Sequence, residues 1–198
     1  MSNFGIQGYF KHTALYVGTL TELDRYFDQE AQTLWGSTVS QYLALNQNSV
    51  FEAKNKPSNK TPMVTIEAMG EGVIMKTLAD SANTDVLAVL RPRMNKKDKL
   101  LAVIYALRQY GKPYDFYFDF KDDHSFICSE LVVKSFESPE NRNSLFPMVN
   151  YHGKPMFLAN DFVREFDGNY GTPQQNTDFV LYLDGNIDHA SLQRNLND

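Results

Sequence analysis

"DDHSFICSELVVKSF", residues 122–136, is the stretch that decides which fold this chain can have. A polar turn passes here into an apolar segment with helical spacing, and we predict a helix that is capped by Ser125 and ends near Phe136. Cys128, the only cysteine among the 198 residues, falls in the first turn of that helix. The thiol therefore either fills space in the core or acts as a nucleophile.

The predicted position of Cys128 suits a nucleophile. A thiol attacks as the thiolate, and its ordinary pKa of about 8.5 leaves little thiolate at neutral pH. The unpaired N–H groups and the positive dipole end of a helix N-terminus stabilise a negative charge, and they can form part of an oxyanion hole. Most single cysteines are simply small buried apolar residues, so position alone leaves both interpretations open.

Composition limits the class of protein. With 198 residues, 42% of them hydrophobic, the chain can bury one sizeable core, and we expect a single domain over 1–198. A net charge of −5 argues against nucleic acid and against an anionic membrane surface as partners. One cysteine permits neither an intramolecular disulfide nor a cysteine-based zinc site, and the histidines show no metal-ligand spacing. We therefore expect no metal or cofactor.

The chain shows no membrane or export signal. No stretch approaches the ~18 apolar residues of a membrane span, and "MSNFGIQGYFKH" (1–12) lacks the pattern of a signal peptide. We expect a soluble chain that is cytoplasmic by default. A leader missing from the sequence would leave no trace, so localisation stays open, as does the oligomeric state.

Strand and helix patterns are interspersed along the chain without regular βαβ alternation. This order favours an α+β fold with a mostly antiparallel sheet. Thr21, with Asp24 three residues on, is the predicted cap of the first helix. No element is predicted for the Pro- and Asn-rich stretch 138–155, and the polar tail 186–198 is expected to fray. The predicted strands are 11–18, 48–53, 63–78, 85–92 and 178–185. Of these, 63–78 contains two strands joined by a turn near glycines, and 85–92 is predicted to be a central strand. The predicted helices are 19–35, 37–46, 95–113 and 157–166.

A nucleophilic cysteine needs a histidine, and the chain offers four. His12 lies in a short predicted strand, which would hold an imidazole rigidly, although a core histidine with satisfied hydrogen bonds is an equal alternative. His124 is four residues before the thiol and is explained as well by a solvated turn. His152 and His189 lie in a loop and in the polar tail, where exposure is the usual explanation.

Three motifs, in their order along the chain, resemble one family. "HTALYVG" (12–18) resembles the H-x-x-(I/L)-Y-x-G strand of the circularly permuted, NlpC-type papain-like cysteine hydrolases, the YiiX/YebB group. "IEAMGEGV" (66–73) resembles the (I/V)-E-A-x-x-x-G-V strand pair of that group. "GKPYDFYFDF" (111–120) and "FICSELV" (126–132) resemble its G-x-x-Y-D and C-S-E-L-V segments. In this chain the histidine motif comes first and the cysteine motif last, which is the order of the permuted enzymes.

This resemblance implies a permuted papain-like fold, in which the cysteine helix packs on a small, mostly antiparallel sheet that carries the histidine. Cys128 would be the nucleophile and His12 its general base and later acid. Glu67 matches the residue that orients the imidazole by accepting its other N–H. A carboxylate on the polar side of a half-exposed strand is the alternative for Glu67, and Glu52 is a weaker substitute for it.

Three further matched residues are candidates for substrate binding. Tyr114 and Asp115 form the "YD" of the motif, and Ser129 follows the cysteine. Tyr114 would line the cleft or point its hydroxyl at the oxyanion, and a purely structural role in the turn after Gly111 and Pro113 is an equal alternative for it. Asp115 suits a structural role in the loop equally well, and Ser129 a role at the helix start.

The chain also departs from the family's pattern. The usual G-D-(I/L) strand before the histidine is missing, and a helical insertion at about 19–62 separates His12 from Glu67. Since this insertion would lie near the cleft, it puts the substrate in doubt more than the chemistry.

The activity implied is that of a cysteine hydrolase. It would cleave an amide, such as a peptide or a cell-wall stem peptide, or an acyl ester, through an acyl-enzyme. The alternative from another class is an inactive papain-like module that binds a peptide or a lipid. An acyltransferase would share the first half-reaction. Composition, with 14 Phe and 11 Tyr, does not separate peptide from acyl-lipid substrates.

Overall fold

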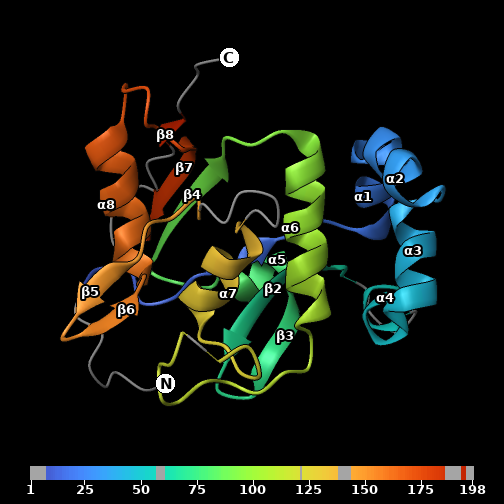
Figure 1. Cartoon of the computed structure of the whole chain (residues 1–198), viewed down its shortest axis with the longest axis horizontal. Coiled ribbons are helices and arrows are strands. Elements are labelled where there is room, and N and C mark those ends of the chain that lie inside the picture. The colour runs from blue at the N-terminus through green and yellow to red at the C-terminus, as the bar shows by residue number, and fades with distance from the viewer. Residues whose placement is uncertain (1–7, 57–60, 121, 138–143, 186–192, 195–198) are drawn as a thin grey trace.

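The structure, a computed structural model, describes residues 8–56, 61–120, 122–137, 144–185 and 193–194 (Figure 1). Helices and short strands follow one another in mixed order, which confirms the α+β class. The described strands form three small sheets, and every strand pair within them is antiparallel.

The first sheet positions the site, and its strand order is β1-β2-β3. It consists of β1 (Leu15–Tyr16), β2 (Met63–Met69) and β3 (Gly72–Thr77). β2 is buried at five consecutive positions, because it lies between two neighbouring strands and α7 (Cys128–Ser135) packs against it. The predicted strand 11–18 forms a ladder only at Leu15 and Tyr16, so His12 lies in the extension that leads into β1.

Four short helices occupy the segment between β1 and β2, and Figure 1 shows them gathered beside α6. They are α1 (Leu20–Tyr26), α2 (Asp28–Trp35), α3 (Val39–Asn46) and α4 (Asn48–Lys54). The predicted cap at Thr21 is wrong. Thr19 caps α1 through a reciprocal pair of hydrogen bonds with Glu22, while Asp24 accepts hydrogen bonds from the backbone and side chain of Ser40.

The strand predicted at 48–53 is also wrong, because this segment forms α4. A partly buried cation at the end of this helix connects it to the first sheet. Lys54 Nζ donates hydrogen bonds to the carbonyl oxygens of Gly18 and Met63, at the end of β1 and the start of β2. Burial lowers the pKa of Lys54 to about 8, and the charge of Glu22 opposes that change.

The second half of the chain adds a second sheet, of order β4-β7-β8, and a hairpin. β4 lies at one edge of the second sheet in the described residues and is not the central strand that was predicted. The hairpin β5–β6 lies in the stretch where no element was predicted. None of the described helices, of which α6 is the longest, has the length and apolarity to cross a bilayer. The elements are α5 (Leu78–Ser81), β4 (Val86–Pro92), α6 (Lys96–Arg108), α7 (Cys128–Ser135), β5 (Val149–Tyr151), β6 (Lys154–Met156), α8 (Ala159–Asn169), β7 (Thr177–Asp184) and β8 (Gln193–Arg194).

The helix that begins at the cysteine lies at the centre of the packing. All eight residues of α7 are buried. Leu131 packs into the core shared with the first sheet and α6, while Val132 and Val133 pack into a second, Phe-rich core beneath α8. The predicted packing of this helix on a small antiparallel sheet is confirmed. A helix held on all sides keeps its first residue in a fixed place.

Gly72 makes the tightest backbone approach near the site, and replacing it with alanine is expected to destabilise the protein. Its φ of 113° disfavours a side chain, and an added Cβ would lie 2.5 Å from the carbonyl oxygen of Lys112. We expect a loss of about 2 kcal/mol or more, which lowers the melting temperature by roughly 4 °C or more. Calorimetry of Gly72→Ala measures it. Gly70→Ala, in the same turn with open space around it, is the control and leaves the melting temperature within about 2 °C.

Candidate active site

Cys128 is the first residue of α7, and its side chain is 6% exposed. The predicted cap at Ser125 is wrong, because the cap position falls on Ile127, whose side chain cannot accept a hydrogen bond. Glu130 compensates, since its Oε2 accepts a hydrogen bond of 3.2 Å from the backbone N–H of Ile127. The unpaired backbone N–H groups in the first turn of α7 therefore lie near the Cys128 sulfur and can donate hydrogen bonds there.

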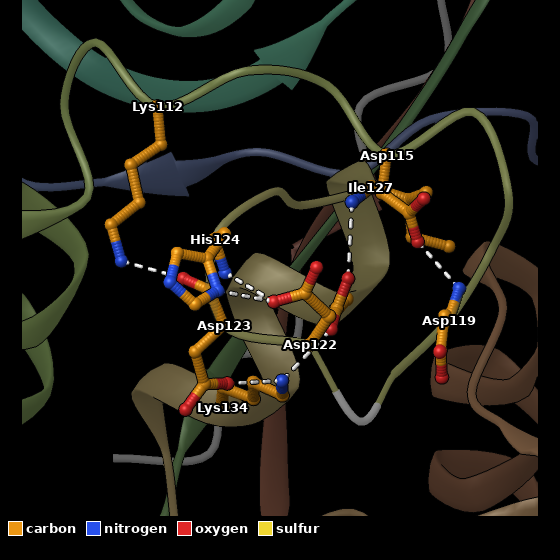
Figure 2. Close-up of polar contacts among 9 residues, drawn as sticks. Lys112, Asp115, Asp119, Asp122, Asp123, His124, Ile127 and Lys134 are labelled. Atoms are coloured by element: carbon orange, nitrogen blue, oxygen red, sulfur yellow. Dashed lines mark hydrogen bonds and ion pairs between the residues drawn. The ribbon is translucent and has the colours of Figure 1, made fainter.

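Two lysine side chains bind the turn before α7 from opposite sides of Asp123, as Figure 2 shows. Lys112 Nζ donates a hydrogen bond of 2.6 Å to the carbonyl oxygen of Asp123, and Lys134 Nζ, from α7 itself, binds the Asp123 carboxylate. Lys134 also lies 2.9 Å from Glu130, which is fully buried. Burial raises the pKa of Glu130 to about 7, although Lys134 opposes that rise. These contacts fix the entry into the cysteine helix.

His12 and Glu67 meet across the first sheet, although 55 residues separate them. His12 Nε2 donates a short hydrogen bond to Oε2 of Glu67, which lies in the middle of β2. The Glu67 side chain is 1% exposed, whereas that of His12 is 37% exposed. A buried carboxylate thus holds one edge of a ring that solvent can reach.

The other oxygen of Glu67 has partners that the sequence does not reveal. Ser81 Oγ, from the short helix α5, donates a hydrogen bond of 2.6 Å to Glu67 Oε1, and Lys76 Nζ lies 3.7 Å from the same atom. Burial alone would raise the pKa of Glu67, but the hydrogen bonds from His12 and Ser81 and the nearby charges lower it below its ordinary value. Glu67 therefore stays ionised beside the histidine.

The Cys128 thiol lies close enough to the His12 ring for each group to shift the pKa of the other. Because Nε2 binds Glu67, Nδ1 is the nitrogen left for the sulfur. Burial lowers the pKa of His12, but the hydrogen bonds to Cys128 and Glu67 outweigh it and raise the pKa to about 9. Burial likewise raises the pKa of Cys128, but His12 and, more weakly, Thr13 outweigh it and lower the pKa below its ordinary value. The two shifts favour a thiolate–imidazolium pair.

The description of the family whose model matches residues 1–165 is "permuted papain-like amidase enzyme, YaeF/YiiX, C92 family". The chain belongs to this family. The match confirms the resemblance drawn from the three motifs, the papain-like fold and the general class of cysteine hydrolase acting on amide bonds. Neither a curated protein nor a solved structure matches the chain.

In this papain-like amidase, Tyr114 lies beside the segment that leads into Cys128. Its backbone bridges to Phe126, two residues before Cys128. Burial, and then the charge of Cys128, raises the pKa of Tyr114 to about 12. The hydroxyl therefore keeps its proton at neutral pH and can donate a hydrogen bond.

Asp115 and Ser129, the other two candidates for substrate binding, are buried in this amidase, at 4% and 1% exposure. The carboxylate of Asp115 accepts hydrogen bonds from the backbone N–H groups of Tyr117 and Asp119, and so it fixes the loop after Tyr114. Ser129 lies in the first turn of α7. A substrate contact by either residue stays a prediction.

The remaining histidines of the amidase are placed apart from the thiol or outside the described residues. His124 is 95% exposed and pairs with Asp122 at 2.6 Å, as expected of a solvated turn residue. His152 lies in the β5–β6 turn with a positive φ of 52°. His189 lies outside the described residues. Sequence reasoning missed Ser81 and Thr13. Ser81 stands in none of the three motifs, and Thr13 falls on a position of the first motif at which no residue type is specified.

Proposed function

We propose that the protein hydrolyses an amide bond through a thioester on Cys128, with His12 as proton carrier and Glu67 as the residue that orients the ring. The contact of one imidazole with both a buried carboxylate and the only thiol carries this proposal. Membership in an amidase family supports the class of bond. The raised pKa of His12 and the lowered pKa of Cys128 support the resting ion pair.

The first half-reaction forms the thioester. The thiolate attacks the carbonyl carbon, and the carbonyl oxygen becomes an oxyanion. The N–H groups at the start of α7 and the Tyr114 hydroxyl are the proposed donors to that oxyanion. When the carbon–nitrogen bond breaks, His12 Nδ1 gives its proton to the leaving amine, which departs neutral.

The second half-reaction releases the acid. His12, now neutral, takes a proton from water, and the hydroxide attacks the thioester carbon. The carbon–sulfur bond breaks, and the thiolate and imidazolium are restored. Throughout the cycle Glu67 accepts the hydrogen bond from Nε2, so the ring keeps Nδ1 towards the sulfur.

The pH dependence of alkylation tests this proposal. We expect iodoacetamide to label Cys128 at pH 6 at a rate within about threefold of that at pH 8, because the thiolate is already present. An ordinary thiol with a pKa of about 8.5 would react roughly 80-fold more slowly at pH 6 than at pH 8. Since Cys128 is the only cysteine, the mass of the labelled protein reports this site alone. A rate that follows the ordinary thiol would favour an inactive binding module.

The pKa of His12 sets the upper limit of the pH range in which the protein should hydrolyse amides. As the pH rises through about 9, the imidazolium loses the proton that the leaving amine needs, so kcat/KM for amide hydrolysis should fall there. Alkylation does not need that proton and should not fall with it. Comparison of the two profiles separates loss of the proton donor from loss of the fold.

A further inference from the structure

Two hydroxyl groups are linked to the Glu67 carboxylate at the oxygen that does not bind His12. Ser81 Oγ is 2.6 Å from Glu67 Oε1 and also 2.6 Å from Thr65 Oγ1. Thr65 precedes Glu67 by two residues in β2, so the two side chains share one face of the strand. Ser81 reaches that face from α5, which follows β3 directly and packs on both β2 and β3. Side chains from two elements therefore meet at this oxygen.

The directions of these hydrogen bonds follow from the charge of Glu67. An ionised carboxylate only accepts, so the one proton of the Ser81 hydroxyl is donated to Glu67 Oε1. The contact between the two hydroxyls then needs the proton of Thr65, which Ser81 accepts. The Lys76 carbonyl oxygen, 3.0 Å from Thr65 Oγ1, competes for that proton over a longer distance. The donors therefore run from Thr65 through Ser81 to the carboxylate, and each one strengthens the next.

The second donor fixes the orientation of the carboxylate. The last side-chain torsion of a glutamate has no sharp preference, so the hydrogen bond with His12 alone would leave the carboxylate free to turn. Ser81 binds Oε1 and thereby keeps Oε2 towards the ring. Glu67 is 1% exposed and Thr65 is 3% exposed, so these contacts form where solvent has little access.

The backbone on both sides of His12 is held by other contacts. Asn160, from α8, accepts hydrogen bonds from the backbone N–H groups of Tyr9 and Phe10 and donates one of 2.8 Å to the Phe10 carbonyl oxygen. On the other side the β1–β2 ladder begins at Leu15. The place of the histidine is thus set from both directions, whereas the orientation of its ring depends on the carboxylate.

The charged groups around Glu67 come from several elements. His12 binds Oε2, and Lys76 Nζ, from β3, lies 3.7 Å from Oε1. The sulfur at the start of α7 lies near the same imidazole. Lys54, from α4, instead binds carbonyl oxygens at the start of β2 and the end of β1, and Asp80, from α5, binds the hydroxyl that caps its own helix. The hydroxyl of α5 is therefore the uncharged donor to the carboxylate.

We propose that Ser81 is a positioning residue, which holds the Glu67 carboxylate towards His12 during the reaction at the cysteine. Thr65 supports it by keeping the Ser81 hydroxyl pointed at that carboxylate. This inference rests on the proposed function, because it assigns Ser81 an effect on the imidazole that carries the proton. It adds to the site two residues that stand outside the three motifs.

Ser81→Ala tests the inference in the full-length protein. We expect kcat/KM for an acyl 4-nitroanilide to fall about tenfold at pH 7, mostly in kcat, because the ring is less well placed while the substrate contacts are kept. A carboxylate with one donor fewer takes up its proton at a higher pH. The acid limb of the kcat/KM profile should therefore move up by about one pH unit. Ser81→Thr keeps a hydroxyl and should restore both values.

An NMR titration measures the same change without a substrate. In protein labelled with ¹³C at the glutamate carboxyl carbons, the Glu67 signal is the one that is lost in Glu67→Gln. Its midpoint should lie about one pH unit higher in Ser81→Ala and move less in Thr65→Val, while Thr65→Ser keeps the parent value. Ser144→Ala, which removes a hydroxyl bound to the Phe146 carbonyl oxygen, is the control and should leave the midpoint unchanged.

A double substitution separates positioning from general support of the fold. In the Glu67→Gln protein the carboxylate through which Ser81 acts is gone, so adding Ser81→Ala should change kcat/KM less than about twofold. A further loss of about tenfold in that background would mean that Ser81 only supports the fold, and it would overturn the inference.

Three more outcomes are informative. An unmoved Glu67 midpoint in folded Ser81→Ala protein, with kcat/KM within about twofold of the parent, would also overturn the inference. A parent midpoint in Thr65→Val would remove Thr65 from the assignment. If the midpoint moves as expected but the parent protein releases no 4-nitroaniline, the proposed hydrolysis fails while the hold of Ser81 on Glu67 stands.

Discussion

Replacing Cys128 with serine is expected to lower kcat/KM for amide hydrolysis by at least about 10³-fold. The serine hydroxyl is similar in size, but its proton must be removed before it can attack. The resting site is arranged for a thiolate, as the lowered pKa of Cys128 and the raised pKa of His12 indicate. Serine also removes the thiolate that raises the pKa of His12, so the resting ion pair is lost and the hydroxyl must be deprotonated during the attack. Release of 4-nitroaniline from an acyl 4-nitroanilide measures the loss.

The control for this substitution lies at the other end of the same helix. Ser135 Oγ donates a hydrogen bond to the carbonyl oxygen of Leu131, so Ser135→Ala changes one buried hydroxyl of α7 without reaching the sulfur. We expect its kcat/KM to stay within about threefold of the parent. If the Cys128→Ser protein kept more than a tenth of the parent activity, the nucleophile would have to be another group.

Replacing His12 with alanine is expected to change two independent readouts. Loss of the general acid and base should lower kcat/KM by about 10²–10⁴-fold. Loss of the cation should also return the pKa of Cys128 towards that of an ordinary thiol, so labelling at pH 6 should slow at least about tenfold. Burial would then raise the pKa of the thiol with less opposition, since Thr13 is the weaker of the two stabilising neighbours.

His124→Ala is the matched control, because His124 is nearer to Cys128 in sequence but its side chain is 95% exposed. Both readouts should be unchanged in that protein. Equal labelling rates at pH 6 in the His12→Ala and parent proteins would mean that the helix N-terminus alone forms the thiolate, and His12 would lose its role. Glu67→Gln should lie between the parent and His12→Ala, since an amide oxygen still accepts from Nε2 but carries no charge.

The parts of the site that could be predicted are those that the motifs fix by their order. His12, Glu67 and Cys128 stand in three separate motifs, and the structure brings the three side chains into contact. The ladder of β2 with β3 was also predictable, because apolar residues alternate before the Gly70–Gly72 turn and a short apolar run follows it. Local patterning and the resemblance agreed at these positions.

Other features depend on contacts between distant residues, which a single sequence does not show. Residues 48–53 contain Val50 and Phe51 and resemble a strand, but Val50 is 1% exposed within a helix that packs on α3. Tertiary packing outweighs the β preference of those residues. Ser81 binds Glu67 from a helix of four residues that no periodicity marks. The cap of α7 was predicted at Ser125, but the structure places it at Ile127. There the side chain of Glu130 takes the place of a conventional capping side chain.

The hold of Asn160 on Tyr9 and Phe10 has a consequence for how the protein is made. The partners are about 150 residues apart, so the ribosome releases the opening segment long before the residue that secures it. Such distant pairings form late, so the segment before His12 lacks its Asn160 contacts until residue 160 has been synthesised. This segment is therefore fixed by residues that leave the ribosome much later than it does.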